Sequence, residues 1–128
     1  MIGSCCETIT YLPENLKNKV EIMGLVDNLA LEYERASFVI VPLFKGSGMK
    51  TKTIEAMSYG KTIFGTDEGF QGIDCDYDKM GGLCNSAETF IEKINNFGGA
   101  LTNEYVLSLF NEKYSNDAIQ ESFNKLFK

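Results

Sequence analysis

Residues 38–66 constrain the fold more than any other part of the chain. They read FVIVPLFKGSGMKTKTIEAMSYGKTIFGT. The continuous apolar run at 38–41 is typical of a strand buried on both faces, and residues 62–65 form the next predicted strand. Two glycines and a helical pattern over 49–59, which Gly60 ends, lie between these strands. Two strands joined by a crossover helix predict parallel pairing.

The rest of the chain continues this alternation of strands and helices. Further short strands are predicted at 1–4, 20–24 and 82–84, and further helices at 28–36, 103–114 and 116–127. A helix after residue 85 presents an apolar face through Phe90, Ile91, Ile94 and Phe97. Strands that alternate with helices through short loops predict an α/β fold, a Rossmann-like parallel sheet with helices on both faces.

Two helix starts and one acidic segment carry local predictions. Asp27 is expected to cap the helix at 28–36, and Asn85 the later helix, with Glu88 in the capping-box position. Asp74, Asp76 and Asp78 alternate like ligands of a metal-binding loop. They lack the glycine and glutamate of a calcium loop, so we expect a solvated acidic loop there.

Composition narrows the class of protein. A chain of 128 residues with a net charge of −6 and no basic run does not favour non-specific nucleic-acid binding. Its longest apolar run is too short to span a bilayer. It contains no histidine, and its four cysteines form no CxxC pair, so no metal site is predicted. Reduced thiols are typical of a cytoplasmic protein.

The glycine turn after the first strand predicts an anion site. Gly46, Ser47 and Gly48 lie where the strand ends and a helix begins. Free backbone N–H groups and the positive end of the helix dipole converge at such a junction. Lys50 and Lys52 add positive charge beside it. A diphosphate fits this pattern, although a turn that only needs a positive φ is the simpler alternative.

Glu55 follows Gly48 by seven residues, almost two helical turns, and therefore lies on the same side of the helix. At a rise of about 1.5 Å per residue, the two positions are roughly 10 Å apart, which matches a phosphate and a ribose diol. The alternatives are an ordinary exposed glutamate or an intrahelical pair with Lys52.

A second glycine-containing pattern is rejected. Gly60, Lys61 and Thr62 resemble the end of a P-loop, but Glu55 stands where that motif needs its first glycine, and a strand rather than a helix follows. In parallel sheets, ligands bind beyond the carboxyl ends of the strands. We therefore expect residues 25–26, 46–48 and 68–72 to meet at one rim.

The chain resembles the C-terminal, donor-binding half of GT-B glycosyltransferases of the large group-1 (GT4-like) family. The pattern runs from a glycine after a strand, through a Tyr-x-x-Ala helix end, to GxGxxxKxxEAxxxGK and a threonine. The residues that match it are Gly24, Tyr33, Ala36, Pro42, Gly46, Gly48, Lys52, Glu55, Ala56, Gly60, Lys61 and Thr66. The resemblance is specific in the middle of the chain and looser at its ends.

The resemblance implies a role for each matching position. Backbone amides of Gly46, Ser47, Gly48 and Met49 would hold the diphosphate, assisted by Lys50 or Lys52. Glu55 would bind the ribose hydroxyls, and Leu25 and Val26 would line the base pocket. The donor would be a UDP-, GDP- or ADP-sugar, and a hexosyl group would pass to a glycan or other acceptor with retention and without a metal ion or further cofactor. Polysaccharide biosynthesis is the expected setting. No catalytic residue is assigned.

Departures from the family pattern lead to further expectations. Ser47 stands where the family often has the first glutamate of an E-x7-E pattern. Residues 1–128 are expected to form the C-terminal half-domain without its first strand and loop and without the N-terminal acceptor domain. The isolated chain is then expected to be inactive unless a partner chain supplies the missing domain.

Two other functions remain as alternatives. One is a non-catalytic α/β assembly module that keeps the fold without binding nucleotide and self-associates through its exposed rim. The other is a flavodoxin-like or receiver-like domain, which lacks support because the expected acidic cluster and flavin loops are not found at the strand ends.

Overall fold

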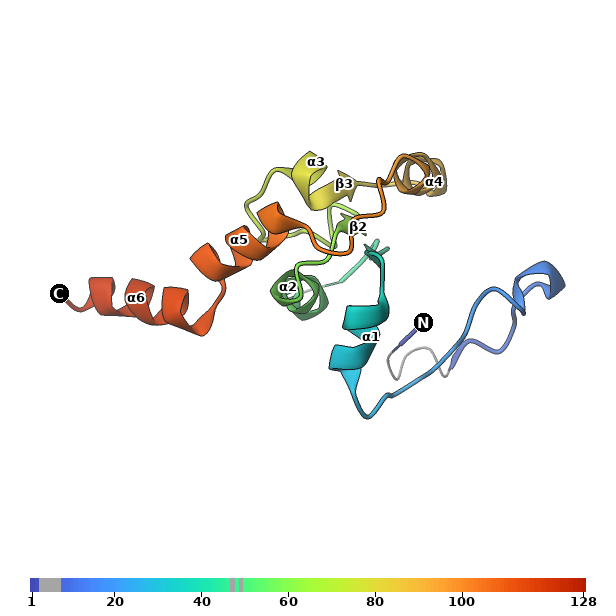
Figure 1. The fold of residues 1–128 in the computed structure, drawn as a ribbon, viewed down its shortest axis with the longest axis horizontal. Helices are drawn as coiled ribbons and strands as arrows, with labels where there is room; N and C mark the ends of the chain where they lie inside the picture. The colour runs from blue at the N-terminus through green and yellow to red at the C-terminus, as the bar shows by residue number, and fades with distance from the viewer. Residues whose placement is uncertain (3–7, 47, 49) are drawn as a thin grey trace. The chain divides into compact units, whose positions relative to one another are not determined.

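The computed structural model describes residues 1–2, 8–46, 48 and 50–128 (Figure 1). The chain divides into two compact units, Met1–Glu32 and Tyr33–Lys128. The division falls within helix α1 (Leu29–Arg35). The larger unit contains the sheet, the glycine turn and Glu55.

Apart from the start of α1, the described residues of the smaller unit have little regular structure. It contains the 3₁₀ turn η2 (Glu14–Leu16) and a single parallel bridge between Ile2 and Gly24, beside which the Met23 amide donates to the Met1 carbonyl over 2.9 Å. The prediction of full strands at 1–4 and 20–24 is wrong for the described residues, which form only this bridge. Residues 3–4 of the first predicted strand lie outside the described residues. An isolated pair of short strands is only marginally stable in water, which fits the single bridge seen among the described residues.

The larger unit is built on a three-stranded parallel sheet in the order β1-β2-β3. The strands are β1 (Val39–Val41), β2 (Ile63–Gly65) and β3 (Gly81–Leu83), with Phe64 opposite Ile40 on one side and Gly82 on the other. The predicted α/β, Rossmann-like parallel fold is confirmed. β2 is buried throughout, whereas Ile40 of β1 is 52% exposed. The prediction that the first strand is buried on both faces is therefore wrong, because β1 lies at the edge of the described sheet.

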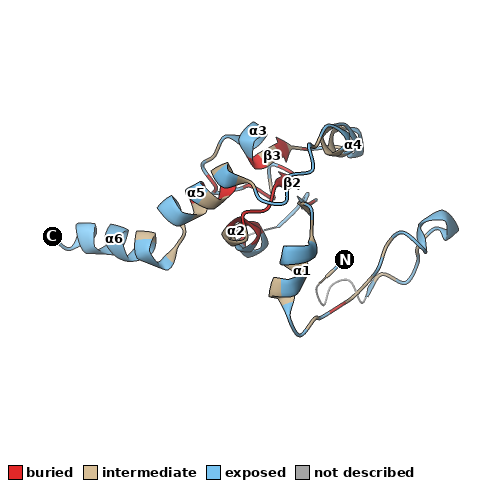
Figure 2. Ribbon diagram, viewed as in Figure 1, coloured by how far each residue is buried: buried red, intermediate tan, exposed pale blue. Residues whose placement is uncertain are grey.

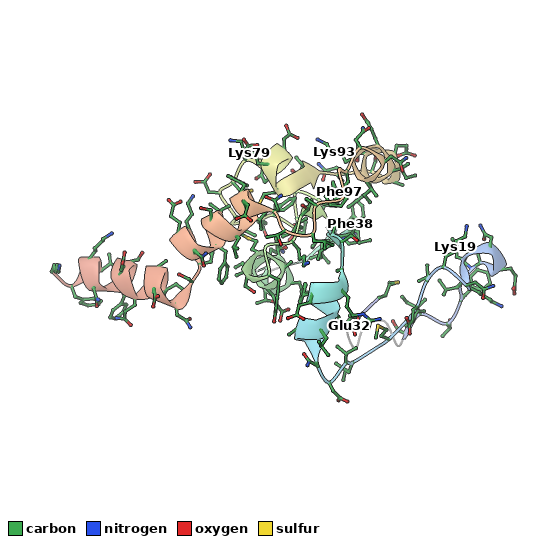
Figure 3. The ribbon with its side chains drawn as sticks, viewed as in Figure 1. Lys19, Glu32, Phe38, Lys79, Lys93 and Phe97 are labelled. Atoms are coloured by element: carbon green, nitrogen blue, oxygen red, sulfur yellow. The ribbon has the colours of Figure 1, made fainter. Side chains whose placement is uncertain are left out.

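The two faces of the sheet are covered by different helices. Ile63 faces the main core, where α2 (Thr51–Ser58) and α5 (Glu104–Lys113) contribute Ala56, Met57, Val106 and Leu109. The next residue, Phe64, points to the opposite face, as the period of a strand requires. There its ring meets Phe38 and Phe97 edge to face, with centroids 5.5 Å and 6.0 Å away, beside α4 (Ala87–Asn95) (Figure 3). Figure 2 shows the buried residues concentrated in α2 and the strands.

The start of α4 differs from the prediction. Ser86, not Asn85, caps the helix, and Thr89, not Glu88, completes the capping box. Asn85 instead holds Asp67: its Oδ1 accepts from the Asp67 amide over 2.9 Å, and its Nδ2 donates to the Asp67 carboxylate over 2.8 Å. Because this tertiary contact occupies the Asn85 side chain, the next residue, Ser86, caps the helix.

Two other caps also differ. At α1, Asn28 rather than Asp27 accepts a hydrogen bond from the helix, from the Leu31 amide. The acidic segment predicted as a loop contains a short helix, α3 (Tyr77–Met80), whose first amides donate to the side chain of Asp76. Asp76 therefore acts as a helix cap, a role for which aspartate is well suited.

The last helix has a different environment from the others. α6 (Asn116–Leu126), predicted at 116–127, is capped by Ser115 and contains no buried residue. It packs against α5, and its Ile119, Phe123 and Leu126 are all exposed (Figure 2). Among the described residues of the larger unit, this apolar side is not part of the core.

Candidate functional site

The loops that follow the three strands are bonded to one another, and we call residues 42–46, 66–72 and 84–86 the carboxyl edge. The Thr66 hydroxyl donates to the Leu43 carbonyl and accepts from the Gly69 amide over 3.0 Å. The Thr53 hydroxyl on α2 donates to the Gly69 carbonyl over 2.7 Å. The two hydrogen bonds between Asp67 and Asn85 join the loop after β3 to the loop after β2. The structure thus brings the glycine turn and the 68–72 loop together, as the sequence predicted.

The two glycines of the turn, Gly46 and Gly48, are exposed. Gly48 has a φ of +93°, and a Cβ atom there would meet no heavy atom within 4 Å. Its backbone conformation therefore favours glycine in any case, so the simpler explanation accounts for this residue. Gly46 has no positive φ, and a Cβ atom there would lie 3.7 Å from both the Lys50 Nζ and a Glu68 oxygen. Ser47 and Met49 lie outside the described residues.

Lys50 is the buried cation beside this turn. Its side chain is only 5% exposed, and its Nζ lies 2.5 Å from the carboxylate of Glu68, which is 21% exposed. A lysine at the start of a helix opposes the helix dipole unless an anion lies nearby. Glu68 is that anion within the protein. This role of Glu68 could not be predicted from the sequence, because a glutamate in a glycine-rich loop carries no distinctive spacing.

Lys50 and Lys52 differ sharply in accessibility. Lys50 occupies the N-cap position of α2, but its side chain caps no amide there. Lys52 is exposed, and no ion pair joins it to Glu55, although the structure describes both residues. The intrahelical pair considered from the sequence is therefore not formed. Lys52 is an exposed cation near the turn, as is Lys45, whereas the buried Lys50 is already paired with Glu68.

Glu55 is exposed and has a partner on another helix. The Tyr33 hydroxyl at the end of α1 donates to its Oε2 over 3.3 Å. The Tyr33 ring stacks on Tyr59, with centroids 4.8 Å apart and planes 10° from parallel. Burial, and then the charge of Glu55, raise the pKa of Tyr33 above its usual value, so the phenol keeps its proton.

A shallow hollow of about 540 Å³ lies along α2 beside Glu55. Thr51, Ile54 and Ser58 line it from α2, while Phe110 and Tyr114 line it from the end of α5. The hollow begins in the first turn of α2, just after the glycine turn, and extends to the second turn. The other two predicted site residues belong to the smaller unit, where Leu25 is 74% exposed and Val26 is partly buried.

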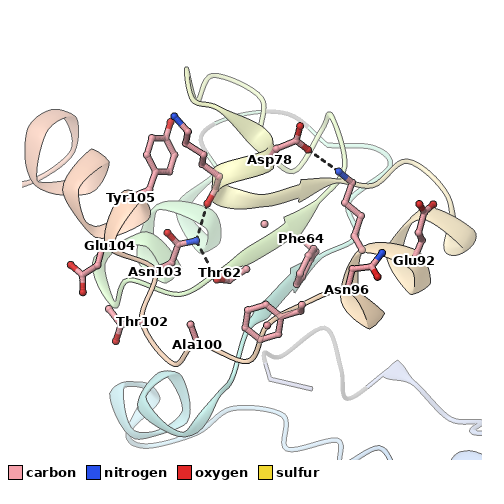
Figure 4. A pocket seen from close by; sticks show the side chains of 15 residues that line it. Thr62, Phe64, Asp78, Glu92, Asn96, Ala100, Thr102, Asn103, Glu104 and Tyr105 are labelled. Atoms are coloured by element: carbon pink, nitrogen blue, oxygen red, sulfur yellow. Dashed lines mark hydrogen bonds and ion pairs between the residues drawn. The ribbon is translucent and has the colours of Figure 1, made fainter.

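A larger hollow lies at the opposite ends of the strands, and we call its lining the amino edge. This cavity of about 650 Å³ is bounded by Thr62 and Gly81, where β2 and β3 begin, and by residues of α4 and the start of α5 (Figure 4). The Asn103 amide donates to the Thr62 hydroxyl over 3.2 Å and to the Lys79 carbonyl over 2.8 Å.

Two lysines that line this cavity are each paired with an aspartate. Lys93 Nζ lies 2.7 Å from Asp78, and this hydrogen bond lowers the pKa of Asp78 and raises that of Lys93. Lys79 pairs with Asp76 and lies 5.6 Å from the centre of the Tyr105 ring. Although this cavity is larger, the ligand chemistry predicted from the sequence lies at the carboxyl edge, where parallel sheets bind their ligands.

Metal ligands do not gather in the described part of the chain. Within it, no three carboxylates or thiols lie close enough to hold a metal ion. Cys75 and Cys84 are free, and burial raises the pKa of both thiols, that of Cys75 to about 11. Cys5 and Cys6 lie outside the described residues. None of the helices that the structure describes combines the length and the apolar character needed to cross a membrane.

Comparison with known proteins places the chain in a family. The sequence model of the family described as "Glycosyl transferases group 1" matches residues 2–97. The match includes the glycine turn, Lys50, Lys52 and Glu55, and it ends before α5 and α6. No curated protein and no solved structure matches the chain.

Proposed function

Because the chain belongs to the group 1 glycosyl transferases, we propose that its carboxyl edge binds the nucleoside diphosphate of a sugar donor. The family match over residues 2–97, which contains both the glycine turn and Glu55, carries this proposal. Glycosyl transferases of this group use nucleotide-sugar donors. Transfer of a hexosyl group from a UDP-, GDP- or ADP-sugar, with retention and without a metal ion, is the reaction we propose.

The diphosphate has two kinds of donor group available. The backbone amides of residues 46–49 and of the first turn of α2 are proposed to supply N–H groups, and the exposed Lys52 a positive charge. Lys50 could reach an anion only if Glu68 released it, because its ammonium group is buried against that carboxylate. We therefore favour Lys52 over Lys50 as the diphosphate contact. Fixed N–H groups and a cation would stabilise the charge of the departing diphosphate.

The remaining contacts belong to the nucleoside. Glu55, in the second turn of α2, is proposed to accept hydrogen bonds from the ribose hydroxyls, and Leu25 and Val26 to line the base pocket. The acceptor is proposed to bind to a separate domain, which either a longer form of this protein or a partner chain supplies. The free thiols of Cys75 and Cys84 fit a cytoplasmic setting, and a role in polysaccharide biosynthesis is part of the same proposal.

Calorimetric titration of the 128-residue chain with UDP, GDP and ADP tests this function. At least one nucleotide is expected to bind, and Glu55→Ala is expected to weaken it about tenfold through the loss of hydrogen bonds to a charged group. Lys52→Ala should weaken it as well. Glu112→Ala, an exposed glutamate on α5, is the matched control and should leave binding unchanged. Failure of all three nucleotides to bind would contradict the proposal.

A second function is favoured by one observation, the exposed apolar side of α6. Ile119, Phe123, Leu126 and the following Phe127 are each more than half exposed. Such a surface is typical of an assembly module. Sedimentation velocity across a range of concentrations distinguishes this function: self-association without any nucleotide affinity would favour it over the donor site.

A further inference from the structure

We propose that Tyr33 is the positioning residue of the donor site, holding one oxygen of Glu55 so that the other faces the ribose diol. This inference rests on the proposed nucleotide site and adds a residue to it. It starts from the contact between the end of α1 and the second turn of α2, where the Tyr33 hydroxyl donates to Glu55 Oε2 over 3.3 Å.

The ring of Tyr33 is itself fixed. It stacks on Tyr59, the residue just after α2, with centroids 4.8 Å apart and planes 10° from parallel. Both partners of Tyr33 therefore belong to the same segment, one within α2 and one at its end. Stacked aromatic pairs contribute beyond their buried area, so the phenol is held at a defined place above the helix.

Glu55 needs such a restraint, because its side chain is exposed and has three rotatable bonds. An exposed glutamate that must become ordered on binding loses rotamer freedom, which weakens the affinity. A carboxylate has about four lone-pair positions, so one hydrogen bond from a phenol leaves room for both hydroxyls of a diol. The hydrogen bond from Tyr33 thus restrains the carboxylate without occupying it.

The protonation state of Tyr33 suits this role. Burial and the charge of Glu55 raise the pKa of Tyr33, so the phenol donates throughout the neutral range. Neither Glu55 nor Tyr33 pairs with a lysine or arginine in the described ion pairs, so the neutral phenol is the group that orients this carboxylate.

The test compares Tyr33→Phe with the wild-type chain, using the nucleoside diphosphate that binds best and its 2′-deoxy form. Phenylalanine keeps the ring and its stack on Tyr59 and removes only the hydroxyl. We expect Tyr33→Phe to weaken the ribonucleotide about three- to fivefold, a size typical of one hydrogen bond. The preference for ribose over deoxyribose should fall by a similar factor. Tyr59→Phe, which removes the hydroxyl of the other ring in the stack, should leave both unchanged.

The Glu55→Ala background completes a double-mutant cycle. There, Tyr33→Phe should have no further effect, because the carboxylate that it positions is gone. The preference for ribose over deoxyribose is a ratio measured within one variant, so a partly unfolded variant does not obscure it. An unchanged ratio in Tyr33→Phe, or additive effects in the cycle, would overturn the inference. Absence of nucleotide binding by the wild-type chain would instead overturn the proposed function itself.

Discussion

The two edges of the sheet hold their charged groups in contrasting ways. At the carboxyl edge, Lys50 is 5% exposed and paired with Glu68 beside the glycine turn. At the amino edge, Lys93 and Asp78 pair across an open cavity, 35% and 83% exposed. The larger hollow is thus lined by a solvated pair, whereas the smaller one follows α2, which begins just after the buried Lys50. A site built from backbone groups at the start of a helix needs no deep cavity, so hollow size alone does not locate it.

The largest contrast is expected from two glycines. A Cβ atom at Gly69 would lie 2.8 Å from the Val41 carbonyl oxygen, whereas at Gly98, beside the amino-edge cavity, it would meet nothing within 4 Å. Gly69→Ala should lower the free energy of unfolding by about 3 kcal/mol, because the loop after β2 must move away from β1. Gly98→Ala should change it by less than about 0.5 kcal/mol. Urea unfolding of both variants measures this, and equal losses would show that the carboxyl edge is no more tightly packed than the amino edge.

The two ion pairs give the next largest contrast. Glu68→Ala leaves the buried ammonium of Lys50 without its carboxylate and should cost about 2 kcal/mol of unfolding free energy. Asp78→Ala removes the carboxylate that pairs with Lys93 in the exposed ion pair, and we expect no measurable change in the unfolding free energy. Urea unfolding midpoints of the two variants provide the comparison. A larger loss from Asp78→Ala would reverse the assignment of which pair matters.

The smallest expected effect is a pH dependence of the exposed pair. The hydrogen bond from Lys93 lowers the pKa of Asp78, so the charged carboxylate stabilises the folded state above its unfolded pKa. That contribution is lost as the pH falls through the lowered value. The thermal midpoints of wild type and Asp78→Asn should therefore converge as the pH falls below the usual aspartate pKa of about 4 and separate slightly above it, near the limit of detection. Added salt should remove the separation. A difference that grows toward acid pH would contradict this sign.

Much of the fold could be predicted where the local pattern and the tertiary environment agree. Gly60 ends α2 with a φ of +60°, and the apolar runs form β1 and β2 in parallel, as the spacing indicated. Predictions were wrong where a distant partner took over a local role. Asparagine is a residue type that often caps helices, but the side chain of Asn85 bonds to Asp67, and Ser86 caps α4 instead. Asp76 caps α3, although its alternation with other aspartates suggested only a solvated loop.

The candidate site divides in the same way. The glycine turn, Lys52 and Glu55 could be identified because their spacing along one strand and helix is local. Tyr33 was identified only as part of the family pattern, and neither its contact with Glu55 nor that of Glu68 with Lys50 could be predicted, since the partners are 22 and 18 residues apart in the chain. The burial of Lys50 could not be predicted from the sequence either, because it depends on Glu68 in another loop. The proposed roles of Leu25 and Val26 stay predictions.

The sequence alone determined the succession of β1, α2 and β2, the glycine turn after β1 and the placement of Glu55 in the second turn of α2. These follow from periodicity, backbone freedom and helix geometry, which act over a few residues. Only the tertiary structure decided that Lys50 is neutralised by Glu68, that Tyr33 reaches Glu55 and that the open cavity lies at the amino edge. Such contacts depend on how separate loops and helices pack, and packing joins residues that no local pattern relates.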